Sequence, residues 1–185
     1  MTLAERLQQR RVALGWVFAA AFAAFARPTP AAILAGAVPL VLGAAVRTWA
    51  AGHIRKGERL AVQGPYALTR NPLYFGSFLM ACGALLMGRN PWLGAAFLLL
   101  AVPAYHVVIR KEEAESAARF GEAFADYCRA VPRFFPRPRL RLPRAAAAGS
   151  FDWELVLRNR EPQAWAGAAL LTLLLLARWY WLGRG

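Results

Sequence analysis

Long stretches without a charged side chain divide this sequence, and they restrict its fold more than any other feature. There are five of them, over residues 12–26, 28–46, 71–88, 90–109 and 162–177. Each is close to the roughly 17–25 residues that a helix needs to cross a bilayer. Within a bilayer the backbone polar groups of a single segment are satisfied only in a helix. The sequence therefore predicts an all-α integral membrane protein with about five transmembrane helices.

Composition favours a membrane protein over a soluble one. Of the 185 residues, 58% are hydrophobic and 18% are charged, and the charges gather between the apolar stretches. The formal net charge is +13, and a basic surface attracts any polyanion, including nucleic acid. Because the basic residues border membrane segments, we expect anionic lipid headgroups as their partner and no nucleic acid. The sequence indicates no protein partner.

The distribution of basic residues predicts the orientation in the membrane. Arg27 and Arg89 stand alone in the first and third connections, whereas the second and fourth connections are rich in arginine. Since cytoplasmic loops carry an excess of Lys and Arg, the N-terminus and these two connections are expected in the cytoplasm and the C-terminus outside. The Ala-rich and Arg-rich composition points to a prokaryotic inner membrane.

Three parts are predicted along the chain. Residues 1–52 would form an N-terminal transmembrane hairpin, residues 53–136 a core with the third and fourth spans, and residues 137–185 a basic linker with the last span. Small residues of the hairpin would let its helices approach closely: Ala19, Ala23, Ala35, Gly36 and Gly43. Cys82 and Cys128 lack the spacing of a metal site, and no metal is expected.

After the fourth apolar stretch the pattern becomes that of an amphipathic helix. Phe120, Phe124, Tyr127 and Val131 recur at helical spacing, with charged side chains on the opposite face. We therefore expect the fourth span to continue into the cytoplasm as a helix that ends at Pro132.

Polar residues cluster at two places on the predicted cytoplasmic side. The first cluster covers residues 64–74, where tyrosine rings and the Asn71 amide suit a purine and a sugar. In the second, Glu112 could accept hydrogen bonds from ribose hydroxyls or an amino group, and Arg110 could face an anionic substrate. Taken singly, such residues are more often interfacial aromatics or the polar edge of a span. Their position on the same side of the membrane favours a functional site.

The order and spacing of these residues resemble the isoprenylcysteine carboxyl methyltransferase family, relatives of the phospholipid N-methyltransferases. The resemblance covers about residues 53–136 and rests on GPY at 64–66, RNPLYFG at 70–76, EE at 112–113, FG at 120–121, Tyr127 and VP at 131–132. It implies S-adenosylmethionine as cofactor. The cytoplasmic pocket would be formed by the loop before the third span, the start of that span and the helix after the fourth.

The resemblance also implies the site residues. Carried over by position, the cofactor-binding residues are Glu58, Arg59, Leu60, Ala61, Tyr66, Arg70, Asn71, Pro72, Leu73, Tyr74 and Glu112. The candidate catalytic residues are Arg110, Asn71 and Glu112. Two positions depart from the family pattern. Asn71 replaces the histidine of eukaryotic members and cannot titrate near neutral pH. Val108 stands where the family has a substrate-contacting arginine, and Arg110 is the nearest replacement. Whether Arg110 or His106 contacts the substrate stays open on the sequence.

The expected activity is methyl transfer to a lipid-like or isoprenylcysteine-like acceptor that enters from the bilayer. A carboxylate or thiolate acceptor is favoured over an amine, because an amine must lose a proton and the chain offers few bases. Two other functions remain open on the sequence: a nicotinamide-dependent membrane reductase of the sterol-reductase type, and a non-catalytic protein that binds anionic lipid.

Overall fold

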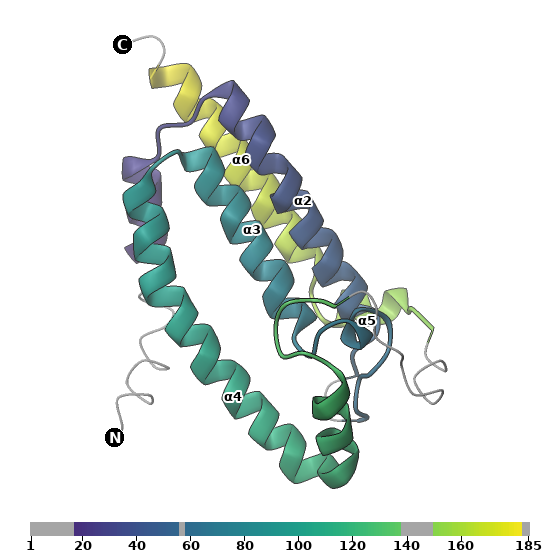
Figure 1. The fold of residues 1–185 in the computed structure, drawn as a ribbon. Helices are drawn as coiled ribbons and strands as arrows, with labels where there is room; N and C mark the ends of the chain where they lie inside the picture. The colour runs from purple at the N-terminus through teal and green to yellow at the C-terminus, as the bar shows by residue number, and fades with distance from the viewer. Residues whose placement is uncertain (1–16, 56–57, 138–149, 183–185) are drawn as a thin grey trace.

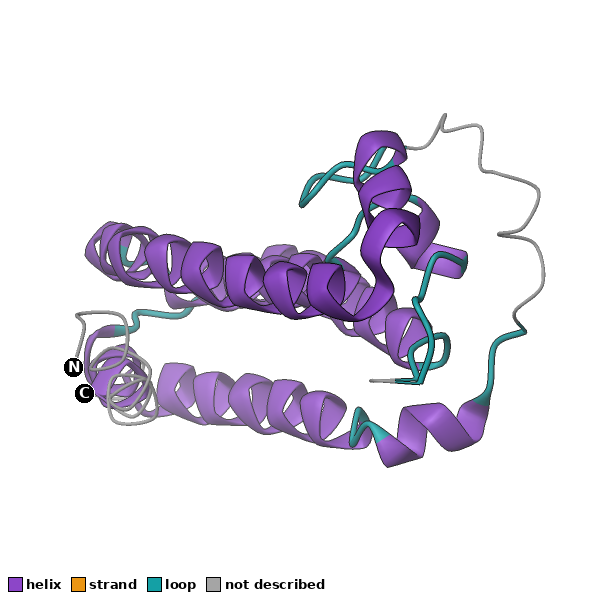
Figure 2. Ribbon diagram, turned by 90° about the horizontal axis from the view of Figure 1, so that it is seen from below, coloured by secondary structure: helices purple, strands orange, loops and turns teal. Residues whose placement is uncertain are grey.

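The computed structural model describes residues 17–55, 58–137 and 150–182. After a helical segment at 17–25, the elements are α2 (Pro30–Ala51), the short 3₁₀ turn η1 (Gly64–Ala67), α3 (Pro72–Gly88), α4 (Pro91–Ala130), α5 (Trp153–Arg158) and α6 (Pro162–Leu182) (Figure 1). Every element in these ranges is a helix or a loop (Figure 2). The predicted all-α membrane architecture is confirmed.

Three of these helices are long and apolar enough to cross a membrane: α2, α4 and α6. The fourth apolar helix, α3, has 17 residues and reaches about 26 Å, slightly less than the hydrocarbon thickness. Proline begins α2, α3, α4 and α6, because its missing N–H has no partner in a first helical turn. The first predicted span, 12–26, lies partly outside the described residues.

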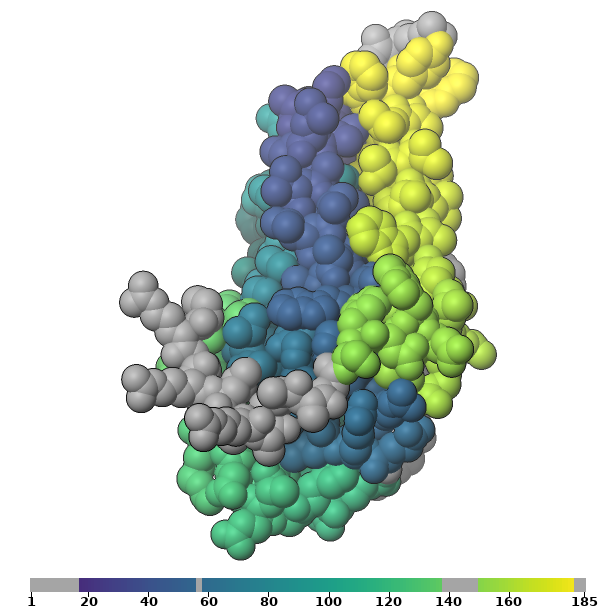
Figure 3. Space-filling view, turned by 90° about the vertical axis from the view of Figure 1, so that its right-hand side faces the viewer, coloured from purple at the N-terminus to yellow at the C-terminus, as the bar shows by residue number. Residues whose placement is uncertain are grey.

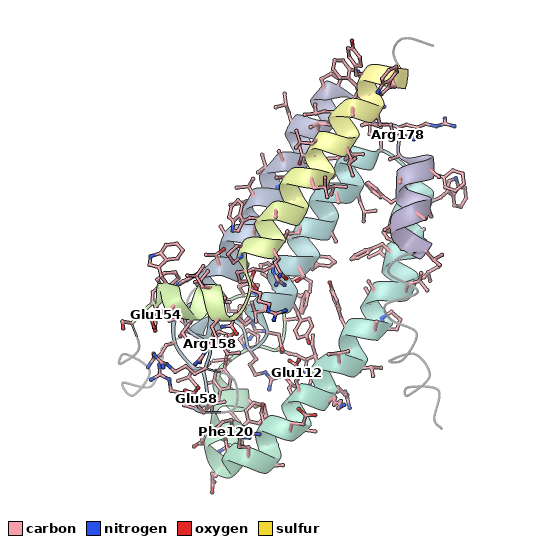
Figure 4. All side chains as sticks on the ribbon, turned by 180° about the vertical axis from the view of Figure 1, so that it is seen from behind. Glu58, Glu112, Phe120, Glu154, Arg158 and Arg178 are labelled. Carbon is pink, nitrogen blue, oxygen red and sulfur yellow. The ribbon has the colours of Figure 1, made fainter. Side chains whose placement is uncertain are left out.

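Glycines bring α2 and α3 into close contact. A Cβ atom added at Gly83 would lie 2.6 Å from the carbonyl oxygen of Gly36, and one at Gly43 would lie 2.5 Å from that of Gly76. Only glycine allows two backbones to approach so closely. The sequence predicted close packing at Gly36 and Gly43, but their partner is α3. The helix at 17–25 lies instead beside the first half of α4 (Figures 1 and 4).

The long helix α4 leaves the bundle and then reverses. Gly121 has φ 53° and ψ −125° inside α4, a backbone conformation that favours glycine. After it, Phe124, Tyr127 and Val131 are buried against side chains that include Leu60. The predicted amphipathic helix is therefore confirmed, while its reversal at Gly121 was not predicted.

Exposed tryptophans mark two levels of the bundle. Trp49 and Trp165 lie near the end where α2 finishes and α6 begins, and Trp92 and Trp181 lie near the opposite end. Tryptophan is enriched at membrane–water interfaces. Along α6, Trp165 and Trp181 are 16 residues apart, or about 24 Å, which is somewhat less than the thickness of a bilayer core.

The C-terminal segment folds back over the end of α2. The Asp152 amide donates to the carbonyl oxygen of Gly52 at 3.0 Å, and the Asn159 side chain donates to the carbonyl oxygen of Ala51 at 3.0 Å. Figure 3 shows α5 seated at that end, with α6 running beside α2. The predicted linker falls mostly on residues 138–149, which lie outside the described part of the chain.

Candidate functional site

A cavity of about 500 Å³ lies at the end of the bundle where α2 finishes and α3 begins. Its walls come from three parts of the chain: residues 54–77 with Arg47, the second half of α4 and the segment before α6. The volume lies within the range of about 300–1,000 Å³ that is usual for small-molecule sites. Residues of both polar clusters line this cavity. This agrees with the prediction that the two clusters lie on the same side of the membrane.

Most of the predicted cofactor residues line this cavity: Arg59, Leu60, Ala61, Tyr66, Arg70, Asn71, Pro72, Leu73, Tyr74 and Glu112. The exception is Glu58, which is exposed and forms an ion pair with Arg158 at 3.3 Å (Figure 4). Arg110 and His106 are exposed side chains of α4 that do not line the cavity. A catalytic role of Arg110 stays a prediction that this geometry does not support.

A hydrogen bond joins the two predicted clusters directly. The hydroxyl of Tyr74, on α3, donates to Oε1 of Glu112, on α4, at 2.7 Å. The bond fixes one carboxylate oxygen of Glu112, a residue that lines the cavity. A carboxylate has further lone pairs, so Glu112 can still accept hydrogen bonds from a ligand.

Tyr66 places a buried hydroxyl in the cavity wall. The side chain is buried, and its hydroxyl has no hydrogen-bond partner among the described residues. Burial raises the pKa of both Tyr66 and Tyr127, so both phenols stay protonated donors. The Tyr127 hydroxyl donates a hydrogen bond to the carbonyl oxygen of Tyr66 at 2.7 Å. Buried donors are nearly always paired, so the Tyr66 hydroxyl is an unusual unpaired donor in a residue that lines the cavity.

Glu113 ties the loop before α3 to the segment after α4. Its carboxylate lies 3.3 Å from a terminal nitrogen of Arg70 and 2.9 Å from one of Arg133. The backbones are joined as well, since the Arg70 amide donates to the carbonyl oxygen of Pro132 at 2.9 Å. The Val-Pro motif after α4 therefore has a structural role, because it holds one wall of the cavity.

Asn71 also has a structural role. It is buried, and its side-chain nitrogen donates to the carbonyl oxygen of Arg133 at 2.9 Å. Its own backbone amide donates to the Thr69 hydroxyl at 3.3 Å. The amide oxygen of Asn71 stays available as an acceptor at the cavity. A catalytic role for Asn71 stays a prediction.

The sequence did not predict the charged pair that closes the membrane side of the cavity. Arg47 binds Glu161 through two bonds, Nε to Oε2 at 3.1 Å and a terminal nitrogen to Oε1 at 2.7 Å. Glu161 is only 3% exposed. The remaining terminal nitrogen of Arg47 donates to the Ser77 hydroxyl. A signal existed, since Arg47 and Glu161 are charges placed at the ends of the second and last apolar stretches.

The charges around the cavity are of both signs. Arg59 and Glu115 line it without an ion-pair partner among the described residues, beside the paired arginines and carboxylates. A mixed lining of this kind suits a ligand that carries both positive and negative groups. Within the described ranges, no group of three or more His, Cys, Asp or Glu side chains could hold a metal ion.

The family follows from a comparison with known protein families. The family model described as "Phospholipid methyltransferase" matches residues 31–123, from the start of α2 to just beyond Gly121. The chain belongs to the phospholipid methyltransferase family. The match includes the cavity residues of α3 and those of α4 as far as Phe120, whereas Phe124 and Tyr127 lie beyond it. Asn159 and Glu161 lie beyond the end of the phospholipid methyltransferase match, so the wall they form is outside the family's common part.

Two curated proteins that are similar to this chain are named as metal resistance proteins. The cobalt-zinc-cadmium resistance protein CzcN of Cupriavidus metallidurans is 33% identical over 139 residues, which cover 74% of this chain and 63% of that protein. The nickel-cobalt-cadmium resistance protein NccN of Alcaligenes xylosoxydans xylosoxydans is 35% identical over 109 residues, covering 58% and 51%. The chain thus spans between half and two thirds of these relatives. No solved structure matches it.

Proposed function

We propose that this member of the phospholipid methyltransferase family uses S-adenosylmethionine to methylate a carboxylate of a lipophilic acceptor. A thiol or an amine is the alternative acceptor group. The observation that carries the proposal is the Tyr74–Glu112 bond in a cavity that gathers the expected cofactor residues. Family membership supports methyl transfer at a membrane, and the cavity supports the cofactor.

The residues of the cavity fit the proposed cofactor. Its amino and hydroxyl groups would find an acceptor in Glu112 and a donor in the unpaired hydroxyl of Tyr66. Its carboxylate would face Arg59, and its base would lie against apolar side chains such as Leu60 and Leu73. S-adenosylmethionine supplies, when bound, a methyl group on a positively charged sulfur.

The small number of unpaired bases among the described cavity residues supports a carboxylate or thiolate acceptor. A carboxylate is already deprotonated at neutral pH, so no side chain has to remove a proton from it. The protein then needs only to orient the two reactants and exclude water. An amine would have to lose a proton, but Glu112 is bonded to Tyr74, and Glu113 and Glu161 are bonded to arginines. Among the described carboxylates of the cavity, this leaves Glu115 as the candidate base. Asn71 cannot serve as a base.

Aromatic rings between α3 and α4 support an apolar tail on the acceptor. The ring centroid of Phe134 lies 5.9 Å from that of Phe75 and 5.8 Å from that of Phe78, and Phe78 lies 6.4 Å from Phe97 of α4. The rings continue from the cavity along the membrane part of α3. They provide an apolar surface for a chain that reaches the cavity from the bilayer.

The test is calorimetric titration of S-adenosylhomocysteine into the detergent-purified protein and into two variants. Tyr74→Phe and Glu112→Gln should each weaken binding by about 1–3 kcal/mol, since each breaks a charge-assisted hydrogen bond. Glu122→Gln is the matched control, because Glu122 is an exposed carboxylate of α4 that does not line the cavity. Equal weakening by the control would contradict the proposed site.

A parallel titration separates the competing functions. Saturable binding of NADPH without binding of S-adenosylhomocysteine would favour the reductase. Binding of neither cofactor by folded protein would favour the non-catalytic lipid-binding function. Methyl acceptors can then be compared directly, with labelled methyl transfer to a farnesylated cysteine, a fatty acid and phosphatidylethanolamine as carboxylate and amine probes.

The names of the two relatives suggest a cellular role, and we propose that the methylated product contributes to tolerance of divalent metals. The support is that similarity alone. A strain that lacks this protein should grow less well in cobalt or nickel and recover with the unchanged protein. Complementation by Glu112→Gln as complete as that by the unchanged protein would contradict a role of methyl transfer in this tolerance.

A further inference from the structure

A second cavity, of about 600 Å³, lies at the end of the bundle opposite the candidate active site. Arg27, Arg89 and Arg178 all line it, and no acidic residue does. In the described residues, every Asp and Glu lies between residues 58 and 161, in the loop before α3 and in the chain beyond the membrane part of α4. Among the residues that the structure describes, therefore, no carboxylate side chain lies near the positive charge of this cavity.

Arg178 is fixed in place by backbone oxygens. Its Nε donates to the carbonyl oxygen of Ala26 at 2.6 Å, and a terminal nitrogen donates to that of Ala24 at 2.7 Å. Figure 4 shows this side chain reaching from α6 to the end of the helix at 17–25. Carbonyl groups orient a guanidinium without neutralising its charge.

The other two arginines have fixed backbones and exposed side chains. The Arg27 amide donates to the carbonyl oxygen of Gly88 at 2.8 Å, and the Arg89 amide donates to that of Leu85 at 3.1 Å. Arg89 has φ 49°, the left-handed conformation that ends α3. Neither guanidinium has an ion-pair or hydrogen-bond partner within the described ranges. Both are available to a ligand in the cavity.

Two helices begin at the same cavity. Thr29 is the N-cap of α2 and Asn90 is the N-cap of α4, and both residues line it. The helix at 17–25 and α3 end at the same cavity, at Phe25 and Arg89, so the partial charges of the helix ends offset one another. The positive charge that favours an anion comes from the three arginines.

The level of the cavity in the bundle suggests the source of the anion. Phe25 lines the cavity and is 61% exposed, and Trp92, two residues after Asn90, is 82% exposed. Large exposed aromatic side chains of this kind lie at the headgroup region of a bilayer. The anion available at that depth is the phosphate of a phospholipid.

We propose that this cavity binds the phosphate of an anionic phospholipid, in the leaflet opposite the candidate active site. Arg27 and Arg89 would contact the phosphate, and Arg178 would hold the cavity open through its bonds to the helix at 17–25. The inference does not rest on the proposed methyl transfer, because the two cavities share no residue.

The test measures binding in the full chain purified in detergent, by the shift of the melting temperature on titration. The probes are short-chain phosphatidylglycerol, phosphatidylcholine of the same chain length, and inorganic phosphate. The variants are Arg27→Gln and Arg89→Asn, alone and combined, and asparagine tolerates the left-handed conformation at position 89. Arg129→Gln is the control, since Arg129 is an exposed arginine at the other end of the molecule.

Phosphatidylglycerol should bind the unchanged protein more tightly than phosphatidylcholine does. Each single variant should weaken it about fivefold and the double variant roughly thirtyfold, with no change in the control. Variants that keep full affinity, or a control that loses as much, would overturn the site. Inorganic phosphate binding as tightly as phosphatidylglycerol would overturn the lipid. If one variant fails to fold, the other single variant decides the outcome.

Discussion

The two sides of α3 show opposite solutions to packing in a membrane. Toward α2, Gly76 and Gly83 leave no room for even a Cβ atom. On the opposite side, Tyr74 and Phe78 present large rings, and α4 diverges from α3 as it approaches the cavity (Figure 1). One side fixes the position of the helix, and the other leaves space for ligands.

This difference indicates where the chain tolerates change. On the α2 side the backbones themselves are in contact, so an added methyl group cannot be accommodated by a change of rotamer. On the α4 side the rings face lipid, a ligand or each other. If a ring is exchanged for a smaller side chain, lipid can fill the space that the ring leaves. We therefore expect stability to depend on the first side and binding on the second.

The largest effect is expected from Gly83→Ala. The new Cβ would lie 2.6 Å from both the Gly36 carbonyl oxygen and the Leu40 amide, so the helices must separate, at a loss above about 3 kcal/mol. Thermal unfolding in detergent measures it. Gly94→Ala is the matched control, because no described atom lies within 4 Å of the added Cβ and alanine favours a helix. Equal stability of the two variants would remove the distinction between the two sides.

A smaller loss, about 3 kcal/mol, is expected from Glu161→Gln, which leaves Arg47 with an uncompensated charge. Arg47 also bonds to Ser77 on α3, so the change loosens the attachment of α6 and α2 to α3. Glu154→Gln, at an exposed position of α5, should unfold as the unchanged protein does. Unaltered stability of Glu161→Gln would mean that this ion pair does not stabilise the packing of α2 and α6 against α3.

Gly121→Ala should lower stability by about 2 kcal/mol, because its positive φ is unfavourable for any residue with a Cβ atom. No described atom would clash with the added methyl, so the loss comes from the backbone alone. Affinity for S-adenosylhomocysteine should fall in parallel, since Phe124 and Tyr127 follow the reversal and line the cavity. Gly94→Ala is again the control. A normal affinity would show that the reversal is not needed for binding.

Raising the pH should lower stability by about 1.4 kcal/mol per pH unit for each buried phenol above pH 10. The pKa of Tyr66 and of Tyr127 is raised in the folded protein, so each stays protonated where the unfolded chain loses that proton. The unfolded state then binds fewer protons, and stability falls as the pH rises. Tyr66→Phe should unfold with a weaker pH dependence between pH 10 and 11. An unchanged dependence would argue against its burial.

The smallest effect is expected from Phe78→Leu, on the open side of α3. Its ring is only partly buried, so stability should change by about 0.5 kcal/mol or less. The same thermal unfolding experiment compares it with Gly83→Ala, five residues away on the other side of the helix. A loss of stability as large as that of Gly83→Ala would contradict the inference that the side of α3 facing α4 is loosely packed.

The sequence by itself determined four apolar helices, α2, α3, α4 and α6, their starting prolines and the meeting of two polar clusters at one end. The first predicted span stays a prediction, because it lies partly outside the described residues. Apolar length and charge distribution are properties of single segments, and they carry this information without a folded structure. The family resemblance then named eleven cofactor residues, and all of them except Glu58 line the cavity. The reversal at Gly121 could have been predicted from the sequence, since a glycine interrupts an amphipathic pattern there.

Only the tertiary structure decided which helices touch. Lipid tails are as apolar as the side chains of a neighbouring helix, so hydrophobicity does not tell which face of a span meets protein. For that reason Gly36 and Gly43 were expected to face the first span, whereas they face α3. The contact of Arg47 with Glu161, and the three arginines at the opposite end, join residues far apart in sequence. No local pattern encodes such pairs, because folding alone brings their segments together.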